Sequence, residues 1–300
     1  MREGLISVIV PVLHDVRLEL LLRSLRSQEV AEQQYEVIVV DNAGDEEIAQ
    51  IARRYGCRYV VETLPGSYAA RNAGLDQAAG DIVAFTDADC VADSKWLDSL
   101  TRVFDAPEIG GVGGRIKKLS RDTWLDRASR DLVEGQVRLQ QLPFSPLPFV
   151  VTGNAAYRAT VPRQIGGFDP RFRSGGDVDL SWRAVLAGHQ LRVVPDAVIY
   201  HASRRSVRAY FRQYAAYATG HARLFKKYHR RLNRRWFIDM YPVGALRYAW
   251  RDLVEAIFSG QHDSNQRFDC LQRAALQLVM CADIAYGDLR GGIRYRTLYL

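Results

Sequence analysis

The residues best suited to chemistry in this chain are two aspartates, Asp87 and Asp89, that directly follow the apolar segment Ile82–Thr86. The segment has the pattern of a buried β-strand, and ligands of open α/β sheets bind at the carboxyl ends of the strands. Two carboxylates there suit Mg²⁺ or Mn²⁺, especially where substrate phosphates complete the coordination shell. The same residues could instead cap a helix or shape a turn. Other parts of the chain must decide between these interpretations.

Three further polar side chains could join this site. Asp41 follows the apolar segment Tyr35–Val40. Two short strands are predicted at residues 191–194 and 197–201, and His201 ends the second of them. Parallel strand ends meet at one edge of a sheet, so both side chains can face the same crevice as Asp89. We expect Asp89 and His201 to bind the metal, and Asp41 to accept hydrogen bonds from a base or ribose. Arg71, in a predicted helix, either pairs with a phosphate or carboxylate of this site or is a surface cation.

A second acidic cluster lies at residues 174–183, where a glycine turn meets a predicted helix. Asp177, near the start of this helix, would be held rigidly and could take a proton from an acceptor hydroxyl. The alternative is that Asp177 is a plain N-cap, a position that aspartate favours.

The elements that would position these residues alternate between strand and helix, a pattern that predicts an α/β fold with a mostly parallel sheet. After residue 206 the pattern changes to long helices. We therefore predict a catalytic domain at residues 1–205 and a helical extension at residues 206–300.

Composition narrows the class of protein. No stretch of about 18 uncharged apolar residues predicts a transmembrane helix, and the apolar run before Pro11 is too short for a signal peptide. The four cysteines are scattered, which indicates reduced thiols rather than a disulfide framework or a zinc knuckle. We expect a cytoplasmic protein.

The basic residues are concentrated in the last third. Residues 201–300 carry 18 Lys or Arg against 7 Asp or Glu, whereas residues 1–200 carry 23 against 27. The segment 204–236 also interleaves aromatic residues. It could dock on an anionic membrane surface or a lipid-diphosphate acceptor, or pack its aromatics as core with solvated arginines. Nucleic-acid binding is the least favoured alternative, and we expect no nucleic-acid partner.

The order of the motifs resembles the family-2 glycosyltransferases, inverting enzymes with the GT-A fold, a Rossmann-like twisted sheet with helices on both faces. The matching segments are Ser7–Val12, Val39–Asn42, Ala70–Gly74, Thr86–Cys90, Gly153–Asn154, Gly166–Pro170, Gly176–Arg183 and Pro195–His201. The resemblance covers residues 7–201 and would place a nucleotide-sugar-binding half at about 1–117 and an acceptor half at about 118–205.

The resemblance also implies roles. Pro11 and Asp41 would line the nucleoside pocket, Arg71 would lie near the diphosphate, and Asp87 would contact the ribose or the metal. Asp89 and His201 match metal ligands, and Asp177 matches the catalytic base. The residues expected to contact the acceptor or support the site are Gly153, Asn154, Asp179, Trp182 and Arg183.

Two departures from the family pattern stand out. Leu13-His14 replaces the usual Tyr-Asn after the first strand, which weakens the expected stacking on the base. Gly176-Asp177 replaces the usual Glu-Asp, so one carboxylate is missing and either Asp177 or Asp179 could be the base. We favour Asp177 as the base, because Asp179 could equally well form an ion pair with Arg183.

These observations together predict a metal-dependent, inverting glycosyltransferase that uses Mg²⁺ or Mn²⁺. The donor would be a nucleotide-diphosphate-sugar, with a UDP-sugar favoured, and the acceptor a hydroxyl, for example of a lipid-linked saccharide. The expected setting is the synthesis of cell-envelope polysaccharide or glycolipid at the inner face of the cell membrane. One alternative is a nucleotidyltransferase, although the loop after Pro11 lacks the glycines of that class. Another is a non-catalytic subunit that binds nucleotide sugar or membrane.

Overall fold

The computed structural model describes residues 4–119, 123–128, 147–202, 206–232, 241–258 and 264–297; the side chains of residues 126 and 241–245 are not described. Contacts between residues divide the chain into two compact units. The described part of the first unit is residues 4–119 and 147–202, and the second unit holds the rest. The predicted boundary at residue 205 and the two predicted halves of the catalytic domain stay predictions.

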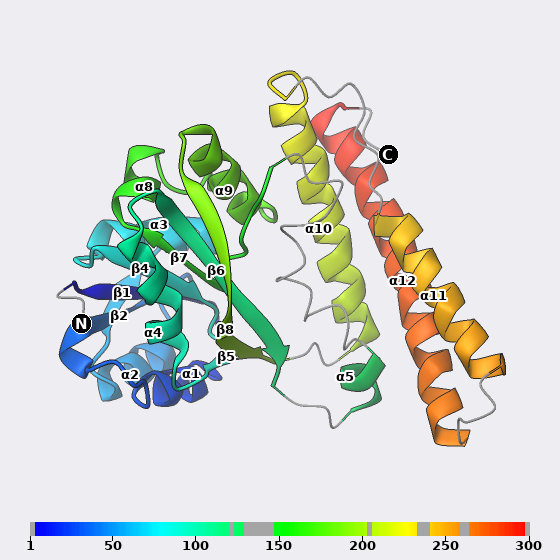
Figure 1. Cartoon of the computed structure of the whole chain (residues 1–300), viewed down its shortest axis with the longest axis horizontal. Coiled ribbons are helices and arrows are strands. Elements are labelled where there is room, and N and C mark those ends of the chain that lie inside the picture. Colours follow the sequence, from blue (N-terminus) through cyan, green and yellow to red (C-terminus); the bar gives the residue numbers. More distant parts are fainter. Residues whose placement is uncertain are drawn as a thin grey trace. The chain divides into compact units, whose positions relative to one another are not determined.

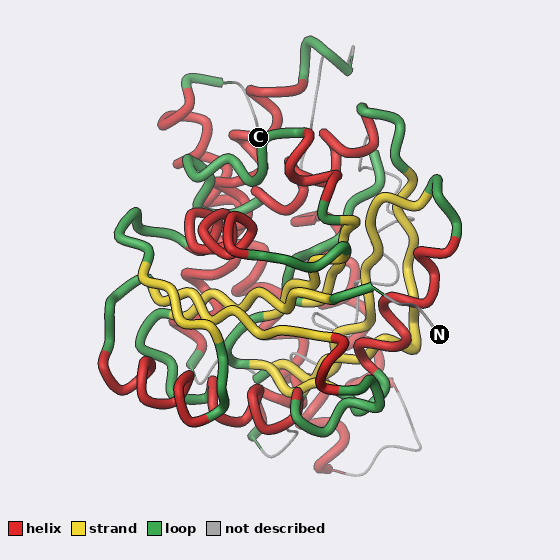
Figure 2. Tube along the Cα trace, turned by 90° about the vertical axis from the view of Figure 1, so that its left-hand side faces the viewer, coloured by secondary structure: helices red, strands yellow, loops and turns green. Residues whose placement is uncertain are grey.

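The first unit is built on a twisted sheet of eight strands (Figures 1 and 2). The strands are β1 Ile6–Val12, β2 Tyr35–Asp41, β3 Arg58–Val61, β4 Ile82–Thr86, β5 Cys90–Ala92, β6 Ile109–Lys118, β7 Asn154–Arg158 and β8 Gln190–His201. Their order across the sheet is β3-β2-β1-β4-β7-β6-β8-β5. The strands β3, β2, β1 and β4 are parallel, β6 and β8 are parallel to each other, and β7 is antiparallel to both β4 and β6. The carboxyl ends of β1, β2 and β4 therefore lie at one edge.

Helices cover both faces of this sheet, because successive side chains of a buried strand point to opposite faces. The helices of the first unit are α1 Leu18–Leu25, α2 Glu46–Arg54, α3 Ser67–Gln77, α4 Trp96–Thr101, α8 Thr160–Gln164 and α9 Gly176–Leu186. The apolar sides of α1, α2 and α4 form one core with Val8 and Val10 of β1. On the other face α3 lies so close to β1 that a Cβ on Gly74 would come within 2.4 Å of Ile9 Cγ2.

The structure corrects one expectation about the strand that carries His201. The sequence predicted two strands, at 191–194 and 197–201, on either side of Pro195 and Asp196. The structure has the single strand β8, and its pairing with β6 jumps from Gly114–Val194 to Arg115–Val198. The extra β8 residues are accommodated as an irregularity of the ladder, so the strand reaches His201 without ending at the proline.

The second unit is helical. Its described helices are α5 Trp124–Ala128, α10 Val207–Tyr228, α11 Tyr241–Phe258 and α12 Ser264–Tyr295. The helices α10 and α12 approach closely because Gly287 lacks a side chain: a Cβ there would lie 2.4 Å from the carbonyl oxygen of Ala215. None of the helices in the described parts of the chain is long and apolar enough to cross a membrane.

Candidate active site

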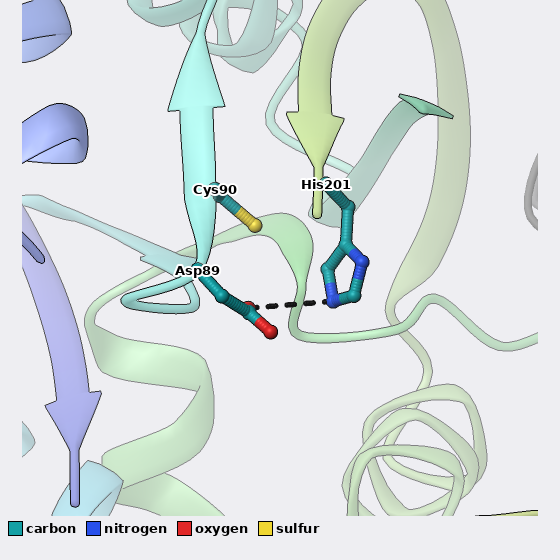
Figure 3. A group of neighbouring side chains, drawn as sticks. All are labelled: Asp89, Cys90 and His201. Atoms are coloured by element: carbon teal, nitrogen blue, oxygen red, sulfur yellow. Dashed lines mark ion pairs between the residues drawn. The ribbon is translucent and has the colours of Figure 1, made fainter. Parts of the chain in front are cut away.

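Asp89 and His201 are brought together by the pairing of two strands. The turn after β4 leads directly into β5, and β5 pairs antiparallel with β8 so that Cys90 lies opposite His201. Asp89 Oδ1 is 3.3 Å from His201 Nε2 (Figure 3). Two neighbouring ligands of an octahedral ion with bonds of 2.0–2.1 Å lie about 3.0 Å apart. The spacing of the carboxylate and imidazole is therefore compatible with a shared Mg²⁺ or Mn²⁺, and their assignment as metal ligands stays a prediction.

Cys90 is the third potential ligand in this group, since its Sγ also lies within 4.8 Å of the Asp89 and His201 donor atoms. Its side chain is buried. Burial, and secondarily the charge of Asp87, raises the pKa of the Cys90 thiol well above its usual value. A protonated thiol is a poor ligand, and thiolate favours softer metals than Mg²⁺ or Mn²⁺. The donor set that fits a hard cation is Asp89 and His201.

Arg17 is a charged neighbour of this group that the sequence did not single out. Its Nη2 lies 3.5 Å from Asp89 Oδ2. Asp15 holds the guanidinium through two hydrogen bonds, Nε to Oδ1 at 2.8 Å and Nη2 to Oδ2 at 2.5 Å. The only sequence signal was a basic residue two positions after an aspartate in the loop after β1. A cation on Asp89 would share that carboxylate with the positive charge of Arg17.

Arg71 and Asp87 form a close ion pair. Arg71 Nη2 donates to Asp87 Oδ1 at 2.5 Å, and the Arg71 side chain is almost fully buried. The Nε of Arg71 finds no hydrogen-bond partner among the described residues. Asp87 is half-buried, with 35% of its side chain exposed. The arginine predicted to lie near the donor diphosphate thus stands beside the Asp-x-Asp turn, where it compensates the charge of the first aspartate.

Asp177 lies in the first turn of α9 and is partly buried. Its Oδ1 accepts a hydrogen bond from the backbone N–H of Val178 at 3.0 Å, and the hydroxyl of Tyr68 lies 3.4 Å from the same oxygen. Burial raises the pKa of the Asp177 carboxyl, and the charge of Arg71 and nearby backbone N–H groups offset part of that effect. A carboxylate with a raised pKa is a better proton acceptor near neutral pH.

Asp179 has a different environment. It is fully buried, and Arg183 Nε donates to its Oδ2 at 2.9 Å. Arg183 also donates to the backbone carbonyls of Ile165 and Gly167, each at 2.6 Å, and so ties α9 to the Gly166-Gly167 turn. The indole of buried Trp182 donates to the carbonyl of Leu147 at 3.1 Å. This geometry favours supporting roles for these three side chains, and the choice of Asp177 as the base stays a prediction.

Gly153 and Asn154 also support the sheet. Asn154 is fully buried; its Oδ1 accepts from the Trp96 indole at 2.8 Å, and its Nδ2 donates to the carbonyls of Arg115 and Ala197 at 2.9 Å. The carbonyl of Gly153 accepts from the Thr86 hydroxyl at 3.2 Å. A Cβ on Gly153 would lie 3.4 Å from Asp87 Oδ2. These contacts favour the supporting role predicted for the pair over a contact with the acceptor.

Asp41 is the last residue of β2, and Pro11 lies one residue before the end of the neighbouring strand β1. Both are buried. The Asp41 carboxylate accepts three hydrogen bonds, from the N–H groups of Ala43 and Asp45 and from the Tyr59 hydroxyl, at 2.6–2.8 Å. These bonds hold the loop after β2. The predicted contact of Asp41 with the nucleoside stays a prediction, and in this structure the carboxylate is satisfied by the protein.

Comparison with known proteins decides the family. The sequence model described as Glycosyl transferase family 2 matches residues 7–166, just over half of the chain. This chain belongs to glycosyl transferase family 2. The predicted family and enzyme class are thereby confirmed, and the nucleotidyltransferase and non-catalytic alternatives lose their support.

Curated relatives of this glycosyltransferase agree with that assignment. It is 30% identical over 206 residues to Glycosyltransferase AglE of Haloferax volcanii, which covers 66% of this chain and 67% of that protein. It is 32% identical over 225 residues to Pre-mycofactocin glycosyltransferase of Mycobacterium tuberculosis, covering 71% of this chain and 46% of that protein. It is 30% identical over 143 residues to Undecaprenyl-phosphate 4-deoxy-4-formamido-L-arabinose transferase of Edwardsiella ictaluri, covering 44% and 43%. The last two matches span less than half of each relative.

A solved structure shows the same fold. Mannosyltransferase PcManGT from Pyrobaculum calidifontis, in complex with GDP-Man and Mn²⁺, superposes with a TM-score of 0.62 at 19% identity. The match covers 95% of this chain and 88% of that one. The predicted GT-A fold with a helical C-terminal extension is confirmed.

Proposed function

We propose that this family-2 glycosyltransferase moves a sugar from a nucleotide-diphosphate-sugar to an acceptor hydroxyl, with a divalent cation and with inversion at the anomeric carbon. The observation that carries the proposal is the placement of Arg71. It contacts Asp87 of the Asp-x-Asp turn, and its charge also acts on Asp177 at the start of α9. The Asp-x-Asp turn beside the proposed metal ligands and the proposed base Asp177 therefore share one buried positive charge, the guanidinium of Arg71.

Each group then has a defined task. Asp89 and His201 would hold Mg²⁺ or Mn²⁺, which supplies positive charge where the departing diphosphate gains negative charge. Arg71 adds a fixed, desolvated positive charge nearby. Asp177 accepts the proton of the acceptor hydroxyl at its carboxylate as the oxygen attacks. A single base and a single displacement lead to inversion.

The donor is proposed by chemical class. The similar mannosyltransferase structure holds GDP-Man and Mn²⁺, whereas the sequence favoured a UDP-sugar. A thermal-shift panel of UDP-, GDP- and dTDP-sugars with and without Mn²⁺ identifies the donor, because a specific ligand stabilises the folded state by mass action. Turnover and product configuration are then measured with that donor, the latter by the anomeric proton coupling in NMR.

The metal requirement is tested with a matched variant. EDTA should abolish turnover, and Mn²⁺ or Mg²⁺ should restore it. Asp89→Ala should be folded and inactive, whereas Asp196→Ala, which removes an exposed carboxylate on β8, should keep wild-type turnover. Full turnover in EDTA would refute the metal assignment, and an α-configured product from an α-configured donor would refute inversion.

A lipid surface is the second part of the proposal, and it rests on the second unit. On α12 the exposed large apolar residues recur at helical spacing along one side; they are Phe268, Leu271, Leu278, Tyr286, Leu289 and Ile293. Leu246, Trp250 and Ile257 form a similar exposed row on α11. Exposed arginines such as Arg247, Arg251, Arg290 and Arg294 flank these rows. Helices of this kind lie in the headgroup region of anionic membranes.

This surface differs from the predicted basic segment. Residues 204–205 and 233–236 of that segment lie outside the described residues. Within α10 the aromatic side chains of Tyr210, Phe225 and Tyr228 are buried, in line with the packing alternative, whereas those of Phe211 and Tyr217 are exposed. We therefore assign the lipid-facing role to the apolar rows of α11 and α12. The net positive charge of residues 201–300 favours an anionic bilayer over a second copy of this chain, whose like charges would repel.

Membrane docking would bring the enzyme to a lipid-linked saccharide acceptor at the inner face of the cell membrane, in line with the relative named as an undecaprenyl-phosphate transferase. The wild type should float with liposomes rich in anionic lipid. Leu278→Glu with Leu289→Glu should abolish flotation at every salt concentration, because the apolar row is interrupted. The control Arg208→Ala with Lys226→Ala changes the net charge equally and should only weaken flotation. Failure of the wild type to float at low salt contradicts the proposal, and a dimer that does not float indicates a second copy instead.

A further inference from the structure

Gly176 precedes Asp177 at the position where the family pattern has a glutamate. Its backbone does not require glycine, because its φ lies outside the left-handed region. The reason for glycine is space. A Cβ on Gly176 would lie 2.7–2.9 Å from three atoms of the Tyr68 ring, closer than real Cβ contacts. The ring of Tyr68 therefore occupies the room that a larger residue 176 would need.

Tyr68 is buried on α3 and contacts both charged groups of the reaction. Its hydroxyl lies 3.4 Å from Asp177 Oδ1. The guanidinium of Arg71 lies over the Tyr68 ring, 5.6 Å from its centroid. The ring of Phe168 also stacks on the Tyr68 ring, with 5.7 Å between the centroids and an angle of 21° between the planes. One rigid aromatic side chain thus links Arg71, which pairs with Asp87, to the carboxylate of Asp177.

We propose that Tyr68 is a positioning residue for the base: its hydroxyl orients the Asp177 carboxylate, its ring holds Arg71 against Asp87, and Gly176 is small so that the ring fits. The inference rests on the proposed function, since it takes Asp177 as the base. In this chain the neutral hydroxyl of Tyr68 takes the place next to Asp177 of the carboxylate that residue 176 lacks. Tyr68 donates a hydrogen bond to the proposed base, Asp177.

The hydroxyl has a predictable effect on proton transfer. A hydrogen bond donated to a carboxylate stabilises its charged form and lowers its pKa. Removing the hydroxyl should therefore raise the pKa of Asp177 further and leave the carboxylate free to turn. The higher pKa leaves less of the base deprotonated at acidic pH, and the loss of orientation slows proton transfer at every pH, while the donor site is untouched.

Tyr68→Phe is the decisive variant, because it keeps the ring and removes only the hydroxyl. We expect kcat to fall about 3- to 10-fold at neutral pH, within the range of a single oriented hydrogen bond. The acid limb of the kcat/KM profile should move to higher pH, and the donor KM should stay within twofold of wild type. Tyr68→Leu also removes the aromatic support of Arg71 and should raise the donor KM as well.

Two further variants separate positioning from simple packing. Tyr157→Phe is the matched control: Tyr157 is equally buried and its hydroxyl bonds to Ser181 at 2.9 Å. It should lower the melting temperature without moving the acid limb. Gly176→Ala keeps every functional group but forces the ring away, so it should lower kcat in the wild type and have little effect in Tyr68→Ala, where the ring is gone. Such non-additivity measures the coupling of the two positions.

The outcomes distinguish this inference from the proposed function. Asp177→Asn is measured in the same series. If Asp177→Asn is inactive while Tyr68→Phe matches wild type in kcat and in pH profile, Tyr68 is a packing residue and the inference is overturned. If Asp177→Asn remains active, the base assignment itself fails. If Tyr68→Phe is unstable, the effect of Gly176→Ala on kcat is compared between the wild type and Tyr68→Ala. Additive effects of the two substitutions contradict the proposal.

Discussion

Asp177 and Asp179 lie two residues apart on α9, yet the structure predicts opposite consequences for the same substitution. Asp179 is fully buried and paired with Arg183, whose other donors hold the carbonyls of Ile165 and Gly167. Asp179→Asn leaves the buried guanidinium without its charge partner. Breaking a buried ion pair costs about 3–5 kcal/mol, and the lower end applies because 18% of the Arg183 side chain is exposed.

Asp177→Asn should instead remove activity and not stability. Burial raises the pKa of Asp177 in the folded state, so the folded protein binds more protons than the unfolded chain between the two pKa values. The stability of the folded state then falls as pH rises through this window. Replacing the carboxyl with a neutral amide removes that penalty at neutral pH. Loss of the base should lower kcat at least 10²-fold, or about 2.7 kcal/mol of transition-state stabilisation.

The assay compares both variants by thermal unfolding and by steady-state kinetics at saturating donor. A loss of about 3 kcal/mol lowers the melting temperature by about 6–12 °C for a domain of this size. We expect that shift for Asp179→Asn, with residual activity in the fraction that is folded. Asp177→Asn should melt at or above the wild-type temperature and be inactive. A folded, inactive Asp179→Asn beside an active Asp177→Asn would refute the reasoning and transfer the base to Asp179.

Two further predictions concern buried groups away from the base. Cys90→Ala should keep the same Mn²⁺ dependence of turnover as wild type, since only Asp89 and His201 are expected to bind the cation; a large loss of Mn²⁺ affinity would add the thiol to the ligands. Asp283 on α12 is fully buried, its oxygens have no hydrogen-bond partner among the described residues, and burial raises its pKa to about 6. The free energy of unfolding should therefore fall by about 2–3 kcal/mol as pH rises from about 4 to about 6. Asp283→Asn should reduce this pH dependence when unfolding is measured at pH 4.5 and 7.5. An unchanged pH dependence in the variant would contradict the prediction.

Much of the fold and of the site could be predicted from local patterns of apolar and polar residues in the sequence. The apolar segments that became β1, β2 and β4 were predicted because a buried parallel strand requires a continuous apolar run. The aspartates after β2 and β4 could then be placed at the carboxyl edge of the sheet, and Asp177 at the start of a helix. Such inferences need only the periodicity of a strand or helix and the rule that parallel strands end at the same side.

The pairing of side chains was decided by the tertiary structure. Tyr68 and Asp177 are 109 residues apart, and Arg71 and Asp87 are 16 apart on separate elements. Local propensity does not encode which side chains meet, because such contacts depend on how α3 and α9 pack around the sheet. The same packing turned Asp41 inward onto Tyr59.

Gly176 and Pro195 show most clearly what the sequence determines and what the tertiary structure decides. Gly176 was visible in the sequence only as a missing carboxylate, and the structure supplied its reason, the ring of Tyr68 beside its Cα. Pro195 predicted a break between two strands, yet β8 continues through it because the ladder with β6 absorbs the extra residues. The sequence alone determined which residues could perform the chemistry and in what order they occur along the chain. The tertiary structure decided which of them touch, because close packing around the sheet selects one set of partners from the many that composition allows.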